Sequence, residues 1–518
     1  MNSVKILWAD DEIDLLRPHI LFLEGKGYEV TAVNNGNEAI KNCQQSKYDL
    51  VFLDENMPGI SGLEALLEIK KAHPSLPVIM ITKSEEEDIM EQAIGQKIAD
   101  YLIKPVNPNQ IIMSIKKVLK SNEIISQKTT SNYQMEFMRI SSQINDSMDA
   151  ESWKDVYNHL IYWEMELQQT GNTMNDMLQM QKTEANNLFT RFIKKHYESW
   201  WKDESKRPLM SPDLFKNKVF PLLDNGKKVF FVLIDNLRLD HWRVMQQELA
   251  TLFQFDTNDT FYSILPTATQ YSRNAIFSGL MPSQIRKMYP QLWVDEEEDE
   301  GKNLNEEALI KTQLERYRKP YAFSYHKINT NQAGEKLNDN LKQLLNNPLN
   351  VVVFNFVDML SHARTEVKLF RELAPDEAAY RSLVLSWFKH SSIADFFRIL
   401  SENDVCIVLA TDHGSIRVKN PIKVVGDKNT NVNLRYKVGK NLAYDKKEVF
   451  ALPQPQACHL PCPNLSSTYI FAGSDDFIAY PNNYNHYVNY YKDTFQHGGI
   501  SLEEMIIPIV SMHPKNRK

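Results

Sequence analysis

The sequence predicts an α/β protein of three parts: an N-terminal doubly wound five-stranded parallel receiver-like domain, a helical middle domain and a C-terminal α/β domain. Short apolar runs alternate with amphipathic stretches at both ends of the chain, which is typical of parallel strands covered by helices. Between these ends, apolar residues recur three and four positions apart, as they do in amphipathic helices. We assign the parts to residues 1–121, 122–208 and 209–518.

The composition is that of an ordinary globular protein. A net charge of -7 provides no basic field for nucleic acid, so we expect no direct DNA binding. Four cysteines in 518 residues cannot form a disulfide framework, which favours a reducing compartment. No apolar run reaches the roughly 18 residues of a membrane span. We therefore expect a cytoplasmic protein without membrane insertion.

In the first part, polar residues follow the apolar runs VKILWA, DLVFL, PVIMI and ADYLI. These residues are Asp10, Asp11, Asp54, Thr82 and Lys104. Any one of them alone would be a strand-end cap, but the carboxyl ends of parallel strands meet at one edge of a sheet. Clustered carboxylates repel one another unless a cation lies among them. We therefore expect magnesium, held by Asp10, Asp11, Asp54, a main-chain carbonyl near Asn56 and water.

These motifs resemble the receiver domain of two-component response regulators. Asp10-Asp11 resembles its acidic pair, Asp54 in LDENMPGISG resembles its phosphoacceptor, and Lys104-Pro105 resembles its lysine, with a peptide bond that is usually cis. The resemblance implies phosphoryl transfer from a sensor histidine kinase to Asp54. It also implies that Thr82 and Tyr101 are switch residues that report the new charge.

The middle part is rich in Gln, Met, Glu, Asn and Lys and shows helical spacing, for example at Trp153, Tyr157 and Leu160. Its methionine stripe is more typical of a packed helical face than of a metal site. An aromatic group should form a core or an interdomain contact; its members are Phe189, Phe192, Tyr197, Trp200 and Trp201. The sequence indicates no chemistry here, and we expect a relay of motion or a dimer contact.

In the third part, three strongly apolar runs lead to aspartates: KKVFFVLIDN to Asp235, NVVVFNFVDM to Asp358 and NDVCIVLATDH to Asp412. Runs this apolar are typical of parallel strands buried on both faces. The three carboxylates should therefore stand along one edge of a sheet.

Histidines accompany these aspartates at informative spacings. His362 lies four residues after Asp358, so the two share one face of a helix. His413 is next to Asp412, and His497 precedes two glycines that permit unusual backbone angles. Carboxylates and imidazoles without thiolates suit zinc or manganese, and there are enough ligands for two ions.

The segment LPTATQYSRNAIFSG offers three candidate nucleophiles, Thr267, Thr269 and Ser272, beside Arg273. A hydroxyl is a poor nucleophile near neutral pH unless a base or a metal removes its proton. The residues alone do not choose among the three.

Together these motifs, over about residues 225 to 510, resemble the alkaline phosphatase superfamily, especially its nucleotide pyrophosphatase/phosphodiesterase members and the bacterial PglZ domain. The resemblance implies one zinc on Asp235, Thr269, Asp412 and His413, and a second on Asp358, His362 and His497. PTATQYSRNAIFSG is similar to the Pro-Thr-x-Thr segment of the diesterases, which selects Thr269 as the nucleophile. The usual Pro-Asn-His is replaced by Tyr271-Ser272-Arg273, and we expect Arg273 to stabilise the phosphoryl oxygens. The implied substrate is a phosphodiester of nucleotide or oligonucleotide type.

The order of the three parts resembles response regulators linked to type IX protein secretion. This resemblance implies homodimerisation on phosphorylation and contacts with secretion-motor or sigma-factor proteins. Two functions stay open: a phosphorylation-regulated two-zinc phosphodiesterase, and a signalling scaffold whose metal site is structural or binds a ligand only. An intact threonine nucleophile favours the enzyme.

Two further segments bear on the third part. The acidic run 295–300 is typical of a solvated loop, with a docking surface for a basic partner as the alternative. The stretch from about 425 to 470 is interpreted as an insertion that shapes the substrate entrance.

Overall fold

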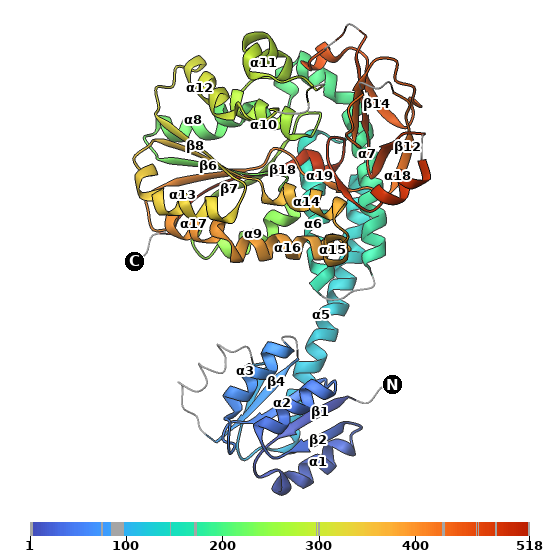
Figure 1. Cartoon of the computed structure of the whole chain (residues 1–518). Helices are drawn as coiled ribbons and strands as arrows, with labels where there is room; N and C mark the ends of the chain where they lie inside the picture. Colours follow the sequence, from blue (N-terminus) through green and yellow to red (C-terminus); the bar gives the residue numbers. More distant parts are fainter. Residues whose placement is uncertain are drawn as a thin grey trace. The chain divides into compact units, whose positions relative to one another are not determined.

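The computed structural model (Figure 1) describes residues 4–73, 76–83, 98–145, 147–169, 174–296, 298, 301–426, 430–462, 464, 466–481 and 484–515. The chain divides into two compact units. One comprises residues 1–133 and 169–172, and the other comprises 134–168 and 173–518. Most of the helical middle segment therefore belongs to the same unit as the C-terminal α/β domain.

The first unit contains a five-stranded parallel sheet in the order β2-β1-β3-β4-β5, which confirms the predicted doubly wound fold. Its strands are β1 Lys5–Ala9, β2 Glu29–Val33, β3 Leu50–Asp54, β4 Val78–Thr82 and β5 Asp100–Ile103. Among the described residues, its helices include α1 Arg17–Glu24, α2 Gly36–Gln45 and α3 Gly62–Ala72.

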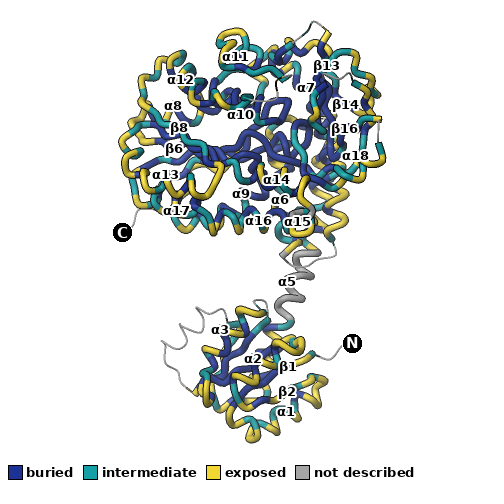
Figure 2. The backbone as a smooth tube through the Cα atoms, viewed as in Figure 1, coloured by how far each residue is buried: buried dark blue, intermediate teal, exposed yellow. Residues whose placement is uncertain are grey.

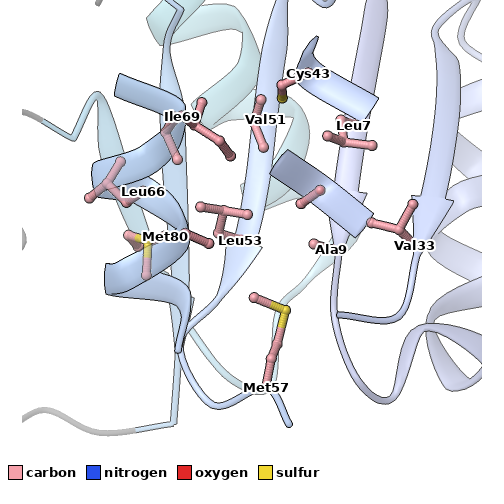
Figure 3. Packing of buried hydrophobic residues seen from close by; sticks show 13 residues of the cluster. Leu7, Ala9, Val33, Cys43, Val51, Leu53, Met57, Leu66, Ile69 and Met80 are labelled. Atoms are coloured by element: carbon pink, nitrogen blue, oxygen red, sulfur yellow. The ribbon is translucent and has the colours of Figure 1, made fainter. Parts of the chain in front are cut away.

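Both faces of this sheet are buried, which explains why its central strands are apolar without alternation. Leu7, Val51 and Leu53 point into the core under α2 and α3 (Figure 3), whereas Trp8 and Phe52 pack on the opposite face. Successive side chains of a strand point to opposite faces, so one apolar run supplies both cores.

The helical middle segment is confirmed. It consists of α5 Pro108–Gln143, which begins in the first unit and ends in the second, α6 Ala150–Gln169 and α7 Asn175–Lys202. The predicted aromatic contact lies where α6 and α7 pack on the C-terminal domain. The ring centroid of Phe189 is 5.4 Å from Trp153 and 6.3 Å from Tyr262, and that of Trp200 is 5.7 Å from Tyr262. These aromatic residues join the helices to the sheet domain.

The second unit is built on a six-stranded sheet in the order β7-β18-β10-β6-β9-β8. Its strands are β6 Val229–Ile234, β7 Phe253–Tyr262, β8 Phe323–Ile328, β9 Leu349–Phe354, β10 Cys406–Ala410 and β18 Ile506–Pro514. The three apolar runs form the adjacent parallel strands β10, β6 and β9. The sheet is mixed, because β18 pairs antiparallel with both β10 and β7.

Twelve further helices occur in the part of the second unit that the structure describes. They are α8 Phe220–Asp224, α9 Leu239–Leu249, α10 Thr269–Ser278, α11 Pro282–Met288, α12 Glu306–Arg316, α13 Asn331–Leu344, α14 Phe356–Glu366, α15 Lys368–Leu373, α16 Glu377–His390, α17 Ser392–Leu400, α18 Tyr484–Tyr491 and α19 Leu502–Met505. The sheet forms the buried centre of the unit (Figure 2).

Three smaller sheets complete the second unit: β13-β15-β14, β12-β16 and β11-β17. Their strands are β11 Ile416–Arg417, β12 Asn420–Lys423, β13 Tyr436–Gly439, β14 Val449–Leu452, β15 Thr468–Ala472, β16 Asp476–Ala479 and β17 Phe495–Gln496. Of the helices that the structure describes in either unit, none combines the length and the apolar character that crossing a membrane requires.

Candidate active site

The first unit brings three of the predicted residues together at the carboxyl edge of its sheet. Lys104 Nζ lies 2.9 Å from Asp10 Oδ2 and 3.0 Å from Asp54 Oδ1. Burial raises the pKa of Asp54 to about 6 in spite of the lysine. Burial opposes the charge of Lys104, but its hydrogen bonds to Asp10 and Asp54 raise its pKa overall. The Lys104–Pro105 peptide is cis, as the receiver resemblance implies.

The residues around this acidic cluster differ in exposure. Oxygen atoms of Asp10, Asp11 and Glu12 lie within 4.8 Å of one another, so Glu12 is a candidate ligand that the sequence reasoning missed. Asn56 is exposed beside Asp54. The buried Thr82 hydroxyl donates to the carboxylate of Glu55, and Tyr101 is 37% exposed on β5. Thr82 thus ends the strand next to that of Asp54, whereas Tyr101 lies one strand further, on β5.

In the second unit, a first carboxylate-imidazole cluster lies where β6 and β10 end. Ligand atoms of Asp235, Asp412 and His413 all lie within 4.8 Å of one another. Burial, together with the nearby charge of Asp412, raises the pKa of Asp235 well above its usual range. Burial also opposes ionisation of Asp412, but the charges of Arg273 and His413 and the hydrogen bonds from Arg273 and Asn236 together outweigh it and lower the pKa of that carboxyl.

A second cluster comprises Asp358, His362 and His497, again within 4.8 Å of one another. Asp358 and His362 share one face of α14, and their Oδ2 and Nε2 atoms are 3.4 Å apart. His497 follows β17, and Gly498 after it adopts a φ of 122°, as the two glycines suggested. Burial lowers the pKa of His497 to about 3, so its ring is neutral and able to bind a metal.

The two clusters are in contact. The rings of His413 and His497 are stacked, with centroids 4.1 Å apart. Asn236, which sequence reasoning missed, links the clusters: its main-chain N–H donates to Asp412 Oδ1 at 3.3 Å and its Nδ2 donates to Asp358 Oδ1 at 3.2 Å. Its φ of 60° is one that asparagine adopts more readily than most residues. The position of Asn236 directly after Asp235 is the sequence feature that could have identified it.

The three candidate hydroxyls occupy different environments. Thr269, the first residue of α10, places its Oγ1 3.1 Å from His413 Nε2 and lines a cleft. Thr267 is fully buried, and its hydroxyl donates to the carbonyl of Gly499 at 2.9 Å. Ser272 is also fully buried, with its Oγ 2.9 Å from that of Ser263. Of these three residues, only Thr269 lines a cleft that a substrate can enter.

Arg273 is buried against carboxylates. Its Nε donates to Asp412 Oδ2 at 2.9 Å, its Nη2 pairs with Asp235, and its Nη1 lies 3.3 Å from Glu306 Oε1. The Arg273 side chain is only 1% exposed, and it pairs with two candidate metal ligands, Asp235 and Asp412, inside the protein. Its expected contact with phosphoryl oxygens stays a prediction.

The cleft has a volume of about 930 Å³ and contains Thr269, His362 and His497 in its lining. Residues 430–434 and Tyr436, from the stretch interpreted as an insertion, form part of its wall. Glu296, from the acidic run, also lines the cleft and accepts hydrogen bonds from the hydroxyls of Tyr271 and Tyr436 at 2.9 and 2.8 Å. It is therefore not a solvated loop residue, whereas 297, 299 and 300 lie outside the described residues.

The donor set of the two clusters suits divalent metal ions. It contains three carboxylates and three imidazoles without thiolate, which fits zinc or manganese. The buried Oδ1 atom of Asp235 has no hydrogen-bond partner, although an unpaired buried carboxylate oxygen is costly. A bound cation would remove that cost.

Comparisons with known proteins agree with this organisation. Residues 6–116 match the response regulator receiver domain, 123–201 match the PorX response regulator linker domain, and 214–512 match the BREX system PglZ alkaline phosphatase-like domain. The receiver domain implies a cognate histidine kinase.

Several curated relatives and solved structures match about a quarter of the chain. The transcriptional regulatory protein ResD of Bacillus subtilis is 34% identical over 119 residues, which are 23% of this chain and 49% of ResD. The CpxR homolog of Haemophilus influenzae is 37% identical over 22% of this chain and 50% of its own length. The chain thus spans about half the length of these relatives. A CheY-like receiver structure from Methanospirillum hungatei is 27% identical over 23% of this chain and 96% of its own, with a TM-score of 0.23.

Proposed function

Because this chain belongs to the PglZ alkaline phosphatase-like family and has the architecture of a PorX-type response regulator, we propose that it is a phosphorylation-regulated two-zinc phosphodiesterase. The observation that carries this proposal is the position of Thr269. Its hydroxyl lines the cleft and lies 3.1 Å from His413, whose ring stacks on His497 of the other cluster. A candidate nucleophile thus lies where the two candidate metal sites meet.

The residues of the two clusters would hold the ions. Asp235, Asp412, His413 and Thr269 form one set and Asp358, His362 and His497 form the other. Bound zinc supplies Lewis-acid stabilisation of charge on the phosphoryl oxygens and lowers the pKa of a hydroxyl or water beside it.

Thr269 is the nucleophile in this proposal. Its oxygen forms a bond to phosphorus while the bond to one alcohol breaks, and the departing alkoxide takes a proton. Water then attacks the phosphothreonine, which releases the phosphomonoester and restores the hydroxyl. Asn236 and Arg273 act as positioning residues, because they hydrogen-bond the carboxylates and leave the reacting atoms to Thr269.

The charges of the cleft favour a diester. Glu296 and Glu366 contribute carboxylates, and Lys302 is the only lysine or arginine among the described lining residues. Moreover, Lys302 Nζ donates to the carbonyl of Glu296 at 3.0 Å and lies 4.0 Å from its carboxylate. A phosphomonoester carries almost twice the negative charge of a diester near neutral pH, so it meets more repulsion here.

The receiver would control this site. We infer that a histidine kinase supplies the phosphoryl group to Asp54 while magnesium binds at Asp10, Asp11, Asp54 and the main chain near Asn56. Thr82 and Tyr101 then favour a homodimer. The PorX-type linker supports a link to type IX secretion, with secretion-motor or sigma-factor proteins as proposed partners.

Hydrolysis of bis(p-nitrophenyl) phosphate by the zinc-loaded chain tests the proposal, with p-nitrophenyl phosphate as the monoester. We expect faster turnover of the diester, a loss of roughly a thousandfold or more in Thr269→Ala, and partial retention in Thr269→Ser, which keeps a hydroxyl. If neither ester is hydrolysed while both metals are bound, the scaffold function replaces the enzyme.

A further inference from the structure

One ligand of the second cluster, His497, lies at the start of a tightly packed segment, His497–Glu504, which we call the 497–504 segment. This segment follows β17 and leads into α19. Gly499 within it has no side chain, and a Cβ there would lie 2.5 Å from the carbonyl oxygen of Ala472. The backbone therefore packs directly against its neighbours, and the groups that hold this segment set the position of His497.

Thr267 contacts three successive residues of the 497–504 segment. Its fully buried hydroxyl donates to the carbonyl of Gly499 at 2.9 Å and accepts from the N–H of Gly498 at 3.0 Å. Its own carbonyl oxygen lies 3.1 Å from His497 Nδ1. Because a carbonyl oxygen only accepts hydrogen bonds, Nδ1 carries the proton of this bond and Nε2 keeps its lone pair. That Nε2 atom lies 3.7 Å from Asp358 Oδ1, so it faces the second cluster.

Helix α7 holds the other end of the segment through Asn186, which is 4% exposed. The Oδ1 atom of Asn186 accepts from the N–H of Leu502 at 2.8 Å, and its Nδ2 donates to Glu503 Oε2 at 3.0 Å. One amide thus satisfies a main-chain donor and a buried carboxylate. Asn186 lies in the stretch that matches the PorX linker domain, whereas the segment that it holds lies in the PglZ match.

A buried carboxylate joins the two ends of the segment. Glu504 Oε1 accepts from the N–H of Gly499 at 2.9 Å. Arg435 fixes the same carboxylate, with its Nη2 2.7 Å from Glu504 Oε2 and both side chains fully buried. The contacts of Asn186 and those of Thr267 are thereby linked within one short segment.

We propose that Thr267 and Asn186 are positioning residues for His497, so that the helical middle segment helps to hold the second metal cluster. Groups that hydrogen-bond a metal-binding histidine fix its tautomer and ring orientation, and loss of one typically weakens metal affinity about ten- to a hundredfold. Thr267 contacts the histidine directly, whereas Asn186 acts through the main chain at Leu502. This inference rests on the proposed function, since it concerns the metal ligands of the same site.

Zinc affinity tests the role of Thr267 without turnover. Full-length protein competes for zinc with a chromogenic chelator, and the competition gives the affinity of the more weakly held ion. Thr267→Val keeps the shape of the side chain but removes the hydroxyl, so the second ion should bind at least about tenfold more weakly. Thr267→Ser keeps the hydroxyl and should bind zinc like the parent.

A matched control separates positioning from general loss of buried hydrogen bonds. Ser278 is fully buried at the end of α10 opposite to Thr269; its hydroxyl donates to the carbonyl of Asn274 at 2.7 Å and accepts from the N–H of Leu280 at 3.2 Å. Ser278→Ala should lower stability and leave zinc affinity unchanged. Parent-like zinc affinity in Thr267→Val, or equal weakening in Ser278→Ala, would overturn the inference.

A second variant acts from α7, away from the active-site segment. Asn186→Leu should weaken binding of the second ion, but less than Thr267→Val does. Asn158→Leu breaks a 2.6 Å hydrogen bond between α6 and Arg243 and should leave zinc affinity unchanged. If Thr267→Val does not fold, as judged by circular dichroism, parent-like zinc affinity in Asn186→Leu overturns the inference. An unmodified protein that binds fewer than two zinc ions would instead show that the proposed function fails, and this inference with it.

Discussion

The acidic cluster of the first unit and the cleft clusters of the second gather carboxylates at the same place, the carboxyl ends of parallel strands. Both place a protein cation among them. In the first unit Lys104 joins two aspartates at 2.9 and 3.0 Å. In the second Arg273 pairs with two aspartates and with Glu306. Each unit thereby offsets the repulsion that clustered carboxylates create.

The two sites differ in their other groups and in their exposure. Three histidines join the carboxylates of the second unit, which suits zinc or manganese, whereas the metal-ligand groups of the described first unit are carboxylates, which suit magnesium. Lys104 is 12% exposed, while Arg273 is 1% exposed. The difference teaches that the same edge of a parallel sheet gathers an oxygen-only set of candidate ligands in one unit and a mixed set of carboxylates and imidazoles in the other.

The largest expected effect is the loss of phosphorylation at the first site without loss of hydrolysis at the second. Asp54→Ala should abolish phosphoryl incorporation from acetyl phosphate, because the acceptor carboxylate is gone, while zinc-dependent hydrolysis of the small diester continues. Intact-protein mass measures incorporation. Asp14→Ala, a change at an exposed aspartate of the same unit, serves as the control and should label normally. Continued labelling of Asp54→Ala would show that the acceptor lies elsewhere.

A smaller effect tests the role of the buried cation. Arg273→Met should lower the free energy of unfolding of the metal-free second unit by about 3–5 kcal/mol, because buried carboxylates lose their partner. Urea unfolding followed by tryptophan fluorescence measures it. Arg398→Met breaks an ion pair to Asp395 whose partners are 65% and 59% exposed, and it should cost about 1 kcal/mol or less. Equal losses in the two variants would contradict the comparison.

The smallest effect concerns a cation buried without a carboxylate. Lys437 is 1% exposed; its Nζ donates to the carbonyl of Asn431 at 2.8 Å and lies 4.5 Å from the centroid of the Tyr480 ring. Burial lowers its pKa to about 7, whereas partner carboxylates raise the pKa values of Lys104 and Arg273.

This lowered pKa predicts a pH dependence of stability. Between about pH 7 and the usual lysine pKa near 10.4, the unfolded chain binds more protons than the native one, so the free energy of unfolding rises with pH. From about pH 7 to pH 9 the contribution of Lys437 should be about 2 kcal/mol. Lys437→Met should lack this part of the rise in urea unfolding. The same rise in both proteins would show that Lys437 is protonated when buried.

Local patterns in the sequence were sufficient for much of the fold, and the family resemblance implied how the candidate ligands group. Apolar runs that lead to Asp235 and Asp412 predicted buried strands with carboxylates at one edge, since strand burial and chain direction are local properties. The spacing of Asp358 and His362 predicted a shared helix face, which α14 provides. Both clusters therefore contain the residues expected of them.

Other features depend on contacts between distant segments, which local patterns do not encode. Asn236 links the two clusters through hydrogen bonds across more than 100 residues of sequence, and Glu296 is drawn into the cleft by two tyrosine hydroxyls. The contact of Arg273 with phosphoryl oxygens stays a prediction, but its carboxylate partners in the fold were not foreseen. The antiparallel strand β18 was likewise not foreseen, because its sequence pattern does not reveal its neighbours.

The zinc content of the full-length chain tests the central claim most directly. Elemental analysis after zinc loading and dialysis without chelator should find about two ions per chain in the unmodified protein. The His362→Ala/His497→Ala variant, which loses two ligands of the second cluster, should retain about one. A chain that binds less than one zinc, or a variant that binds as much as the unmodified protein, would contradict the two-metal account of the cleft.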